Sequence, residues 1–107
     1  MIYTVIYTTI GVPMGGKSFG PLILIRPKYR DDRGLLEHEK VHVRQWWAWA
    51  KTGFLHRPSH FDREVEAYRE QIKWYPYPTI NYFAERLANN YGFDITIDEA
   101  RKALQGG

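Results

Sequence analysis

The chain has 107 residues, of which 44% are hydrophobic and 25% are charged, so it can form one domain with a small core. Its 15 Lys and Arg side chains against 12 Asp and Glu side chains leave a net charge of only +3, which does not indicate a polyanion-binding protein. Because the sequence contains no cysteine, disulfides and thiolate metal sites are excluded. We therefore expect a single domain over residues 1–107, in which any metal has His and carboxylate ligands.

The first part of the chain predicts a small β-structure. Residues 2–10 alternate two sets of side chains and are rich in β-branched and aromatic residues, which is typical of a strand. Residues 11–21 are dense in Gly and Pro and predict a loop. The apolar run of residues 22–25 then predicts a second, more buried strand, which ends at Arg26 and Pro27.

Two long helices are predicted next. Residues 35–50 contain no Pro or Gly and carry many long helix-favouring side chains, so they predict the first helix. Ser59 is followed three residues later by Asp62, a spacing that is typical of an N-cap with an acid in the first turn. This pair predicts a second helix over residues 60–74.

The last third of the chain predicts two further helices. Thr79 can cap a helix that ends near Asn90. Thr96 and Glu99 have the spacing of a capping box, which predicts a short last helix over residues 97–104. The predicted fold class is therefore α+β, with a small N-terminal sheet or hairpin followed by a helical pack.

Residues 11–18, GVPMGGKS, match the pattern G-x-x-x-x-G-K-[ST] of a phosphate-binding loop. Such a loop works because a helix begins directly after its Lys and Ser and directs backbone amides at the phosphates. In this chain the next residues, 19–21, lead instead into a predicted strand, and no later apolar strand ends in an Asp that could hold magnesium. We therefore interpret the segment as a Gly-rich hairpin loop.

A second pattern, H-E-x-x-H, is formed by His38, Glu39 and His42 within the first predicted helix. Because the two histidines are one helical turn apart, both imidazoles can reach one metal ion. Glu39 lies about 100 degrees round the helix, where its carboxylate can reach a metal-bound water without binding the metal. Two imidazoles alone hold zinc poorly, so a third protein ligand is needed.

The third metal ligand could come from the first predicted helix or from the second. The metzincin arrangement would require Gly and His where this chain has Gln45 and Ala48, so that arrangement is excluded. The second predicted helix offers Glu64, Glu66 and Glu70. On a helical wheel Glu64 borders the apolar stripe, whereas the other two point to solvent. Glu64 is therefore the predicted third ligand.

Together these residues resemble the gluzincin branch of zinc metallopeptidases, in particular its minimal single-domain members, the minigluzincins. Glu64-Val65-Glu66-Ala67-Tyr68 is similar to the downstream family pattern E-x-x-x-D, or E-x-x-A-D, and places its first Glu at the third ligand. The last position, usually an acid that buttresses a ligand histidine, is Tyr68 here. The chain also resembles short phage-encoded proteins that carry H-E-x-x-H.

The resemblance implies a zincin-like fold with an active-site helix and a glutamate helix, and a hydrolase that cleaves a peptide or protein substrate. His38, His42 and Glu64 would bind Zn²⁺, and Glu39 would act as general base. The resemblance also implies that the upstream strand offers its edge to the substrate by strand addition. The residues of that strand are Leu22, Ile23, Leu24 and Ile25.

A peptidase of this kind is also expected to have a Tyr or His that stabilises the oxyanion. The sequence does not choose among the side chains that qualify by type, which are Tyr75, Tyr77, Tyr82, His56 and His60. A further hypothesis, motivated by the small size of the family, is that the last helix covers the cleft and keeps the enzyme latent.

Two other classes of protein fit parts of the sequence. A zinc-stabilised, non-catalytic interaction protein with a metallopeptidase-like fold would need the three ligands but not Glu39. A nucleic-acid-binding module would use Arg26, Lys28 and Arg30 for phosphate contacts and Tyr29 for stacking. Because neighbouring acidic residues dilute this charge, we expect no nucleic-acid partner.

The chain shows no targeting or membrane-spanning pattern. Its first residues lack a basic region followed by a long apolar stretch, and no run approaches the roughly 18 apolar residues of a membrane span. We therefore expect a cytoplasmic protein without a membrane partner. The sequence makes no prediction of oligomeric state.

Overall fold

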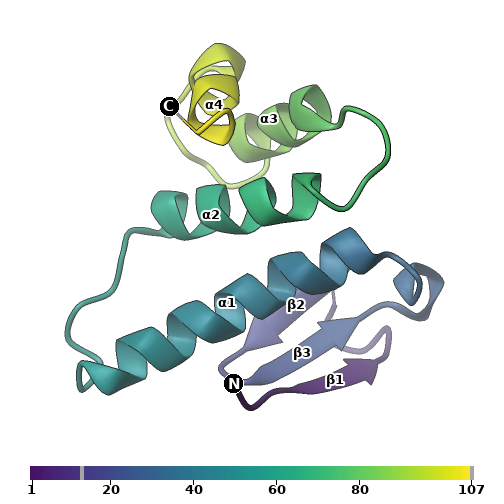
Figure 1. Cartoon of the computed structure of the whole chain (residues 1–107), viewed down its shortest axis with the longest axis vertical. Helices are drawn as coiled ribbons and strands as arrows, with labels where there is room; N and C mark the ends of the chain where they lie inside the picture. Colours follow the sequence, from purple (N-terminus) through teal and green to yellow (C-terminus); the bar gives the residue numbers. More distant parts are fainter. Residues whose placement is uncertain (13, 107) are drawn as a thin grey trace.

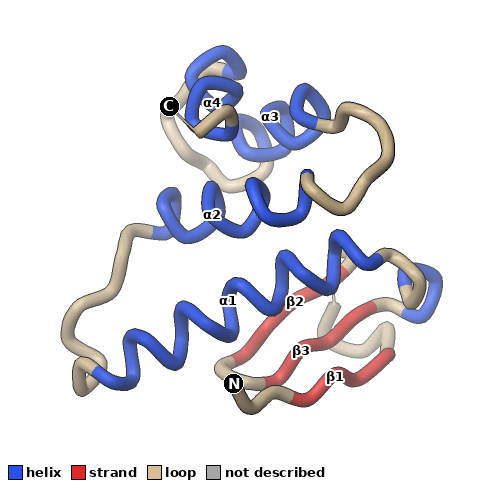
Figure 2. Tube along the Cα trace, in the orientation of Figure 1, coloured by secondary structure: helices blue, strands red, loops and turns tan. Residues whose placement is uncertain are grey.

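The computed structural model describes residues 1–12 and 14–106, so Pro13 of the predicted loop and Gly107 of the predicted domain lie outside the described residues. The fold class is α+β, with a small three-stranded N-terminal sheet followed by four helices (Figures 1 and 2). The elements are β1 (Thr4–Tyr7), β2 (Gly16–Phe19), β3 (Leu22–Ile25), a 3-10 turn (Pro27–Tyr29), α1 (Arg33–Lys51), α2 (His60–Ile72), α3 (Ile80–Asn89) and α4 (Ile97–Leu104). None of these helices is long and apolar enough to cross a membrane.

The sheet has the strand order β1-β3-β2, with β3 parallel to β1 and antiparallel to β2. β3 is central because it is the most apolar strand, and its Ile23 and Ile25 are buried. The prediction that residues 11–21 form a loop is wrong for residues 16–19, which form β2. Strand β1 is also shorter than the predicted strand over residues 2–10.

Helix α1 lies between the sheet and α2 (Figure 1). Its N-terminus is capped by Asp32, whose Oδ1 accepts a hydrogen bond from the Leu35 amide at 3.0 Å. On the sheet side, Val43 packs with Ile23 and Ile25 in one buried cluster. The helix extends over residues 33–51, slightly beyond the predicted 35–50.

Helices α2, α3 and α4 share a second buried cluster. Its members are Tyr68, Phe83, Ala84, Leu87, Ala100 and Leu104. The caps predicted at Ser59 and Thr96 are confirmed, because their hydroxyls accept hydrogen bonds from the Asp62 and Glu99 amides. Thr79 precedes α3 as predicted, but its side chain makes no capping hydrogen bond.

Candidate metal centre

The side chains of His38, His42 and Glu64 come together between α1 and α2. His42 Nε2 lies 2.6 Å from Glu64 Oε2, and His38 Nε2 lies 3.5 Å from Glu64 Oε1. One ligand atom from each of the three residues lies within 4.8 Å of the other two. The one-turn spacing on α1 sets the two imidazoles beside each other, with ring centroids 4.9 Å apart.

This donor set fits a metal ion. Zinc binds imidazole nitrogen and carboxylate oxygen at about 2.0–2.2 Å in a tetrahedron, which separates neighbouring donor atoms by roughly 3–4 Å. The two donor separations here, 2.6 Å and 3.5 Å, lie close to that spacing. His38 and Glu64 are each only 5% exposed, so the donors are held by packing rather than extended into solvent. The group could therefore hold a metal, with the 2.6 Å contact between His42 and Glu64 widening to admit the ion.

The other two glutamates considered as ligands lie elsewhere. Glu66 is exposed, and its Oε1 accepts a hydrogen bond from Gln45 Nε2 at 2.7 Å. Glu70 Oε2 accepts a hydrogen bond from Lys73 Nζ at 3.1 Å. Of the three glutamates on α2, Glu64 is the one whose carboxylate faces both imidazoles.

The charges around Glu64 favour the ionised form of its carboxylate. Burial raises the pKa of Glu64, but hydrogen bonds from His38 and His42 and their positive charge outweigh burial and hold the pKa well below its usual range. Burial lowers the pKa of His42, but its hydrogen bond to Glu64 and the negative charge there raise the pKa above its ordinary value. Glu64 is therefore ionised at neutral pH, which is the state that binds a metal.

His42 is oriented by a chain of hydrogen bonds. Its Nδ1 lies 2.9 Å from Gln45 Oε1, and Gln45 Nε2 donates to the Arg63 carbonyl oxygen at 3.0 Å as well as to Glu66. Because the Gln45 oxygen can only accept, His42 Nδ1 carries a proton. Nε2 faces Glu64 and donates to it in the metal-free protein, and it would bind a metal after losing that proton.

His38 has no such partner. Its Nδ1 is buried and without a hydrogen bond among the described residues. The ring of Tyr68 packs edge-on against its imidazole, with centroids 4.5 Å apart. The Tyr68 hydroxyl is hydrogen-bonded to the Tyr91 hydroxyl. Tyr68 thus lies beside the candidate ligand His38 and restrains it by packing.

Glu39 lies beside the three candidate ligands and faces β2. Its side chain is buried, and burial raises its pKa, with the charges of His38 and His42 and the Ser18 hydroxyl acting in the opposite direction. A Cβ atom added to Gly16 would lie 3.3 Å from Glu39 Oε2, so glycine at this position leaves room for the carboxylate. The arrangement provides a carboxylate of raised pKa next to a possible metal, which suits a general base.

These groups line an open cleft of about 500 Å³ between α1, α2, β2 and the start of the C-terminal helices. The strand that borders it is β2, through Gly16, Lys17 and Ser18. The prediction that residues 22–25 offer a sheet edge is wrong, because β3 is paired on both sides, to β1 and to β2. The free sheet edge beside the site therefore belongs to β2.

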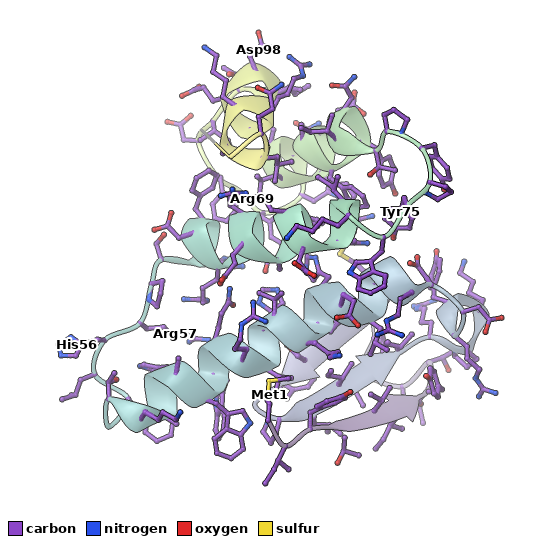
Figure 3. All side chains as sticks on the ribbon, in the orientation of Figure 1. Met1, His56, Arg57, Arg69, Tyr75 and Asp98 are labelled. Carbon is purple, nitrogen blue, oxygen red and sulfur yellow. The ribbon has the colours of Figure 1, made fainter. Side chains whose placement is uncertain are left out.

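Three of the five candidates for the oxyanion role line this cleft: Tyr75, Tyr82 and His60. Figure 3 shows His56 at the outer side of the loop between α1 and α2, with its side chain pointing away from the molecule. Tyr75 is engaged elsewhere, because its hydroxyl donates to Asp32 Oδ1 and accepts from Gln71 Nε2, both at 2.8 Å.

The cleft also contains residues that the sequence did not single out. Tyr91, between α3 and α4, and Arg86, on α3, both line it. Neither is part of a local pattern, so only the packing of α3 against α2 brings them to the site. The hypothesis that residues 97–104 cover the cleft is wrong, because α4 lies beside α3 on the side of α2 away from α1 (Figure 1), and no described α4 residue lines the cleft.

Comparisons of this chain with protein-family models, with curated proteins and with solved structures gave no match.

Proposed function

We propose that this protein is a zinc-dependent metallopeptidase of minimal, gluzincin-like type with a zincin-like fold. The observation that supports it most is the convergence of His38, His42 and Glu64, with Glu39 buried beside them at the base of an open cleft. Two imidazoles and one carboxylate leave one position of a tetrahedral zinc site for water or substrate, as in catalytic rather than structural zinc sites.

The chemistry follows from the positions of the side chains. Zinc held by the three ligands supplies a Lewis acid that polarises a peptide carbonyl and lowers the pKa of water. Glu39 takes the proton from the attacking water and passes it to the leaving amine. Its raised pKa suits both steps, because a carboxyl group that is hard to ionise holds the proton long enough to return it.

The peptide substrate is proposed to lie along β2. This strand pairs with β3 on one side only, so its other backbone edge is available for strand addition. Gly16 and Ser18 of β2 border the cleft that contains Glu39. An extended peptide paired to β2 would therefore pass beside the general base and the metal ligands.

Peptide cleavage by the zinc-loaded protein tests this proposal, with Glu39→Gln as the decisive variant. The variant should retain one zinc and lose about 10²- to 10⁴-fold in kcat/KM, because it keeps the ligands and removes the base. Glu70→Gln on α2 is the matched control and should cleave like the wild type, since Glu70 pairs with Lys73 away from the ligands.

Either of two results would contradict the proposal. Undiminished cleavage by Glu39→Gln would remove Glu39 from the mechanism. A zinc-loaded wild type that cleaves no member of a diverse peptide library would favour a zinc-stabilised interaction protein.

A further inference from the structure

Arg86 brings a positive charge to the cleft and has no carboxylate partner among the described residues. Its Nη1 donates to the Tyr82 hydroxyl at 3.2 Å, and its Nη2 lies 3.9 Å from the Met14 sulfur. Its Nε is buried without an acceptor, and no ion pair among residues 1–12 and 14–106 involves Arg86. Because a partly buried charge without a counter-ion is unfavourable, this arrangement points to an anionic ligand.

Arg86 is also close to the candidate metal centre. Both Arg86 and Tyr68 line the cleft, and the Tyr68 ring packs directly on His38. Arg86 therefore borders the same cleft as the candidate metal ligands. A peptide bound in this cleft could therefore contact Arg86 and the candidate metal centre at the same time.

The other basic side chains that line the cleft have partners of their own. Arg57 lies over the ring of Trp49 at 4.2 Å, and Lys17 lies over an aromatic ring of its own strand at 4.9 Å. Arg63 Nη1 donates to a backbone carbonyl oxygen at 2.6 Å. Arg86 also lies over an aromatic ring, that of Tyr82, but at 5.8 Å, the longest of these separations. The hydrogen bonds of its side chain in the described chain go only to the Tyr82 hydroxyl and the Met14 sulfur.

The carboxylates that line the cleft do not neutralise Arg86. Glu64 is bonded to the two imidazoles, and Asp32 accepts hydrogen bonds from Tyr75 and from the amide that begins α1. Glu39 is buried against β2. A ligand with its own carboxylate would complete the charge balance of this part of the cleft.

We propose that Arg86 binds a carboxylate of the peptide substrate within this cleft. The inference rests on the proposed peptidase function and narrows its substrates to peptides with such a carboxylate. The planar guanidinium can bind the two oxygens together, which makes Arg86 a specificity-determining residue. The carboxylate is either the free C-terminus of the peptide or the side chain of an Asp or Glu.

The test measures peptide binding by calorimetry with zinc-loaded Glu39→Gln protein, so that affinity is read without cleavage. The probes are N-acetylated tripeptides in two matched pairs. One pair differs only in a free or amidated C-terminus, and the other pair, amidated throughout, differs only in Asp or Asn. The variants compared are Arg86→Gln and Arg30→Gln, each combined with Glu39→Gln. Arg30 is the matched control, because it is exposed over the Tyr7 ring and does not line the cleft.

The proposal predicts that one carboxylate-bearing probe binds about tenfold or more tightly than its uncharged match, the size expected for a charge-assisted hydrogen bond. Arg86→Gln should abolish this preference and Arg30→Gln should keep it. Arg86→Lys, which keeps the charge but loses the planar fork, should keep part of it. A preference for the free C-terminus identifies the α-carboxylate, and a preference for Asp identifies the side chain.

Equal affinity within both pairs, or a preference that persists in Arg86→Gln, would overturn the role of Arg86. If wild-type enzyme still cleaves uncharged peptides, the proposed function stands while this inference fails. If no probe binds and the wild type cleaves no peptide, both fail together.

Discussion

His38 and His42 lie one turn apart on α1 but have different surroundings. His42 contacts polar groups from the N-terminal half of α2, whereas His38 lies among aromatic rings. The His42 imidazole is fixed through Gln45, which is itself bonded to Glu66 and to a backbone carbonyl oxygen. The His38 imidazole is packed against Tyr68, and its Nδ1 has no hydrogen-bond partner among the described residues. The same helix thus supplies two candidate ligands with different kinds of support.

A histidine that binds a metal needs both the correct ring orientation and the correct tautomer. The two histidines differ in which of these their neighbours provide. Packing by Tyr68 restricts the orientation of His38, but it offers no acceptor that would keep the proton on Nδ1. Gln45 supplies both the orientation and the acceptor for His42. We therefore expect the metal affinity of the site to depend more on Gln45 than on the Tyr68 hydroxyl.

The largest effect is expected from Glu64→Ala, which removes the carboxylate shared by both imidazoles. The variant should lose most of its zinc, because two histidines alone bind the ion weakly. Zinc per chain after dialysis is the measurement, and Glu70→Ala on the same helix is the control. Glu66→Ala is less suitable, since Glu66 holds Gln45. Full zinc retention by Glu64→Ala would show that Glu64 is not a ligand.

The second largest effect on zinc affinity is expected from removing Gln45, which orients His42. Gln45→Ala should weaken zinc binding about 10- to 100-fold, the range typical of losing a group that orients a ligand. Competition with a chromophoric chelator measures this affinity. Glu66→Gln keeps an acceptor oxygen for Gln45 and should have a much smaller effect. Unchanged affinity in Gln45→Ala would mean that both histidines are held by packing alone.

Tyr68→Phe tests the aromatic support of His38. The ring remains in place, so zinc affinity should change by less than about threefold, well below the effect of a lost orienting group. The Tyr91 hydroxyl loses its partner, which should lower the free energy of unfolding by about 1 kcal/mol in thermal or urea denaturation. A large loss of zinc affinity would show that the Tyr68 hydroxyl supports His38 after all.

The smallest expected effect is a pH dependence of the metal-free protein. Because the pKa of His42 is raised above 6.5, its contribution to stability is complete below that pH and is lost as the pH rises through the folded-state pKa. The lowered pKa of Glu64 contributes above 4.5 and is lost as the pH falls through its folded-state value.

The Tm of the metal-free protein should therefore fall as the pH rises above about 6.5, and this fall should be weaker in Glu64→Gln. Zinc should reverse the trend in the wild type, because it binds the neutral imidazoles that become more abundant at higher pH. A Tm of the metal-free wild type that is identical to that of Glu64→Gln across this range would contradict the assigned coupling.

Local sequence patterns were sufficient to predict the features that depend on a single helix. The one-turn spacing of His38 and His42, and the place of Glu64 at the border of the apolar stripe of α2, depend only on helical periodicity. The caps at Ser59 and Thr96 likewise depend on side chains and amides within four residues.

Features that depend on tertiary contacts could not be predicted from local sequence patterns. The sequence of β2, GKSF, is a poor strand by composition and becomes one because β3 pairs with it. The same pairing closes both edges of β3 and gives the edge beside the cleft to β2. Arg86 and Tyr91 reach the cleft because α3 and the following loop fold back over α2, and no local spacing encodes this contact.

The most direct test of the metal centre is the X-ray absorption spectrum of zinc bound to the wild-type protein after dialysis. The structure predicts two imidazole nitrogens and a carboxylate oxygen in the coordination shell, at about 2.0–2.2 Å, together with one further light atom. A shell with no imidazole or with three, or a protein that keeps no zinc, would contradict a centre built from His38, His42 and Glu64.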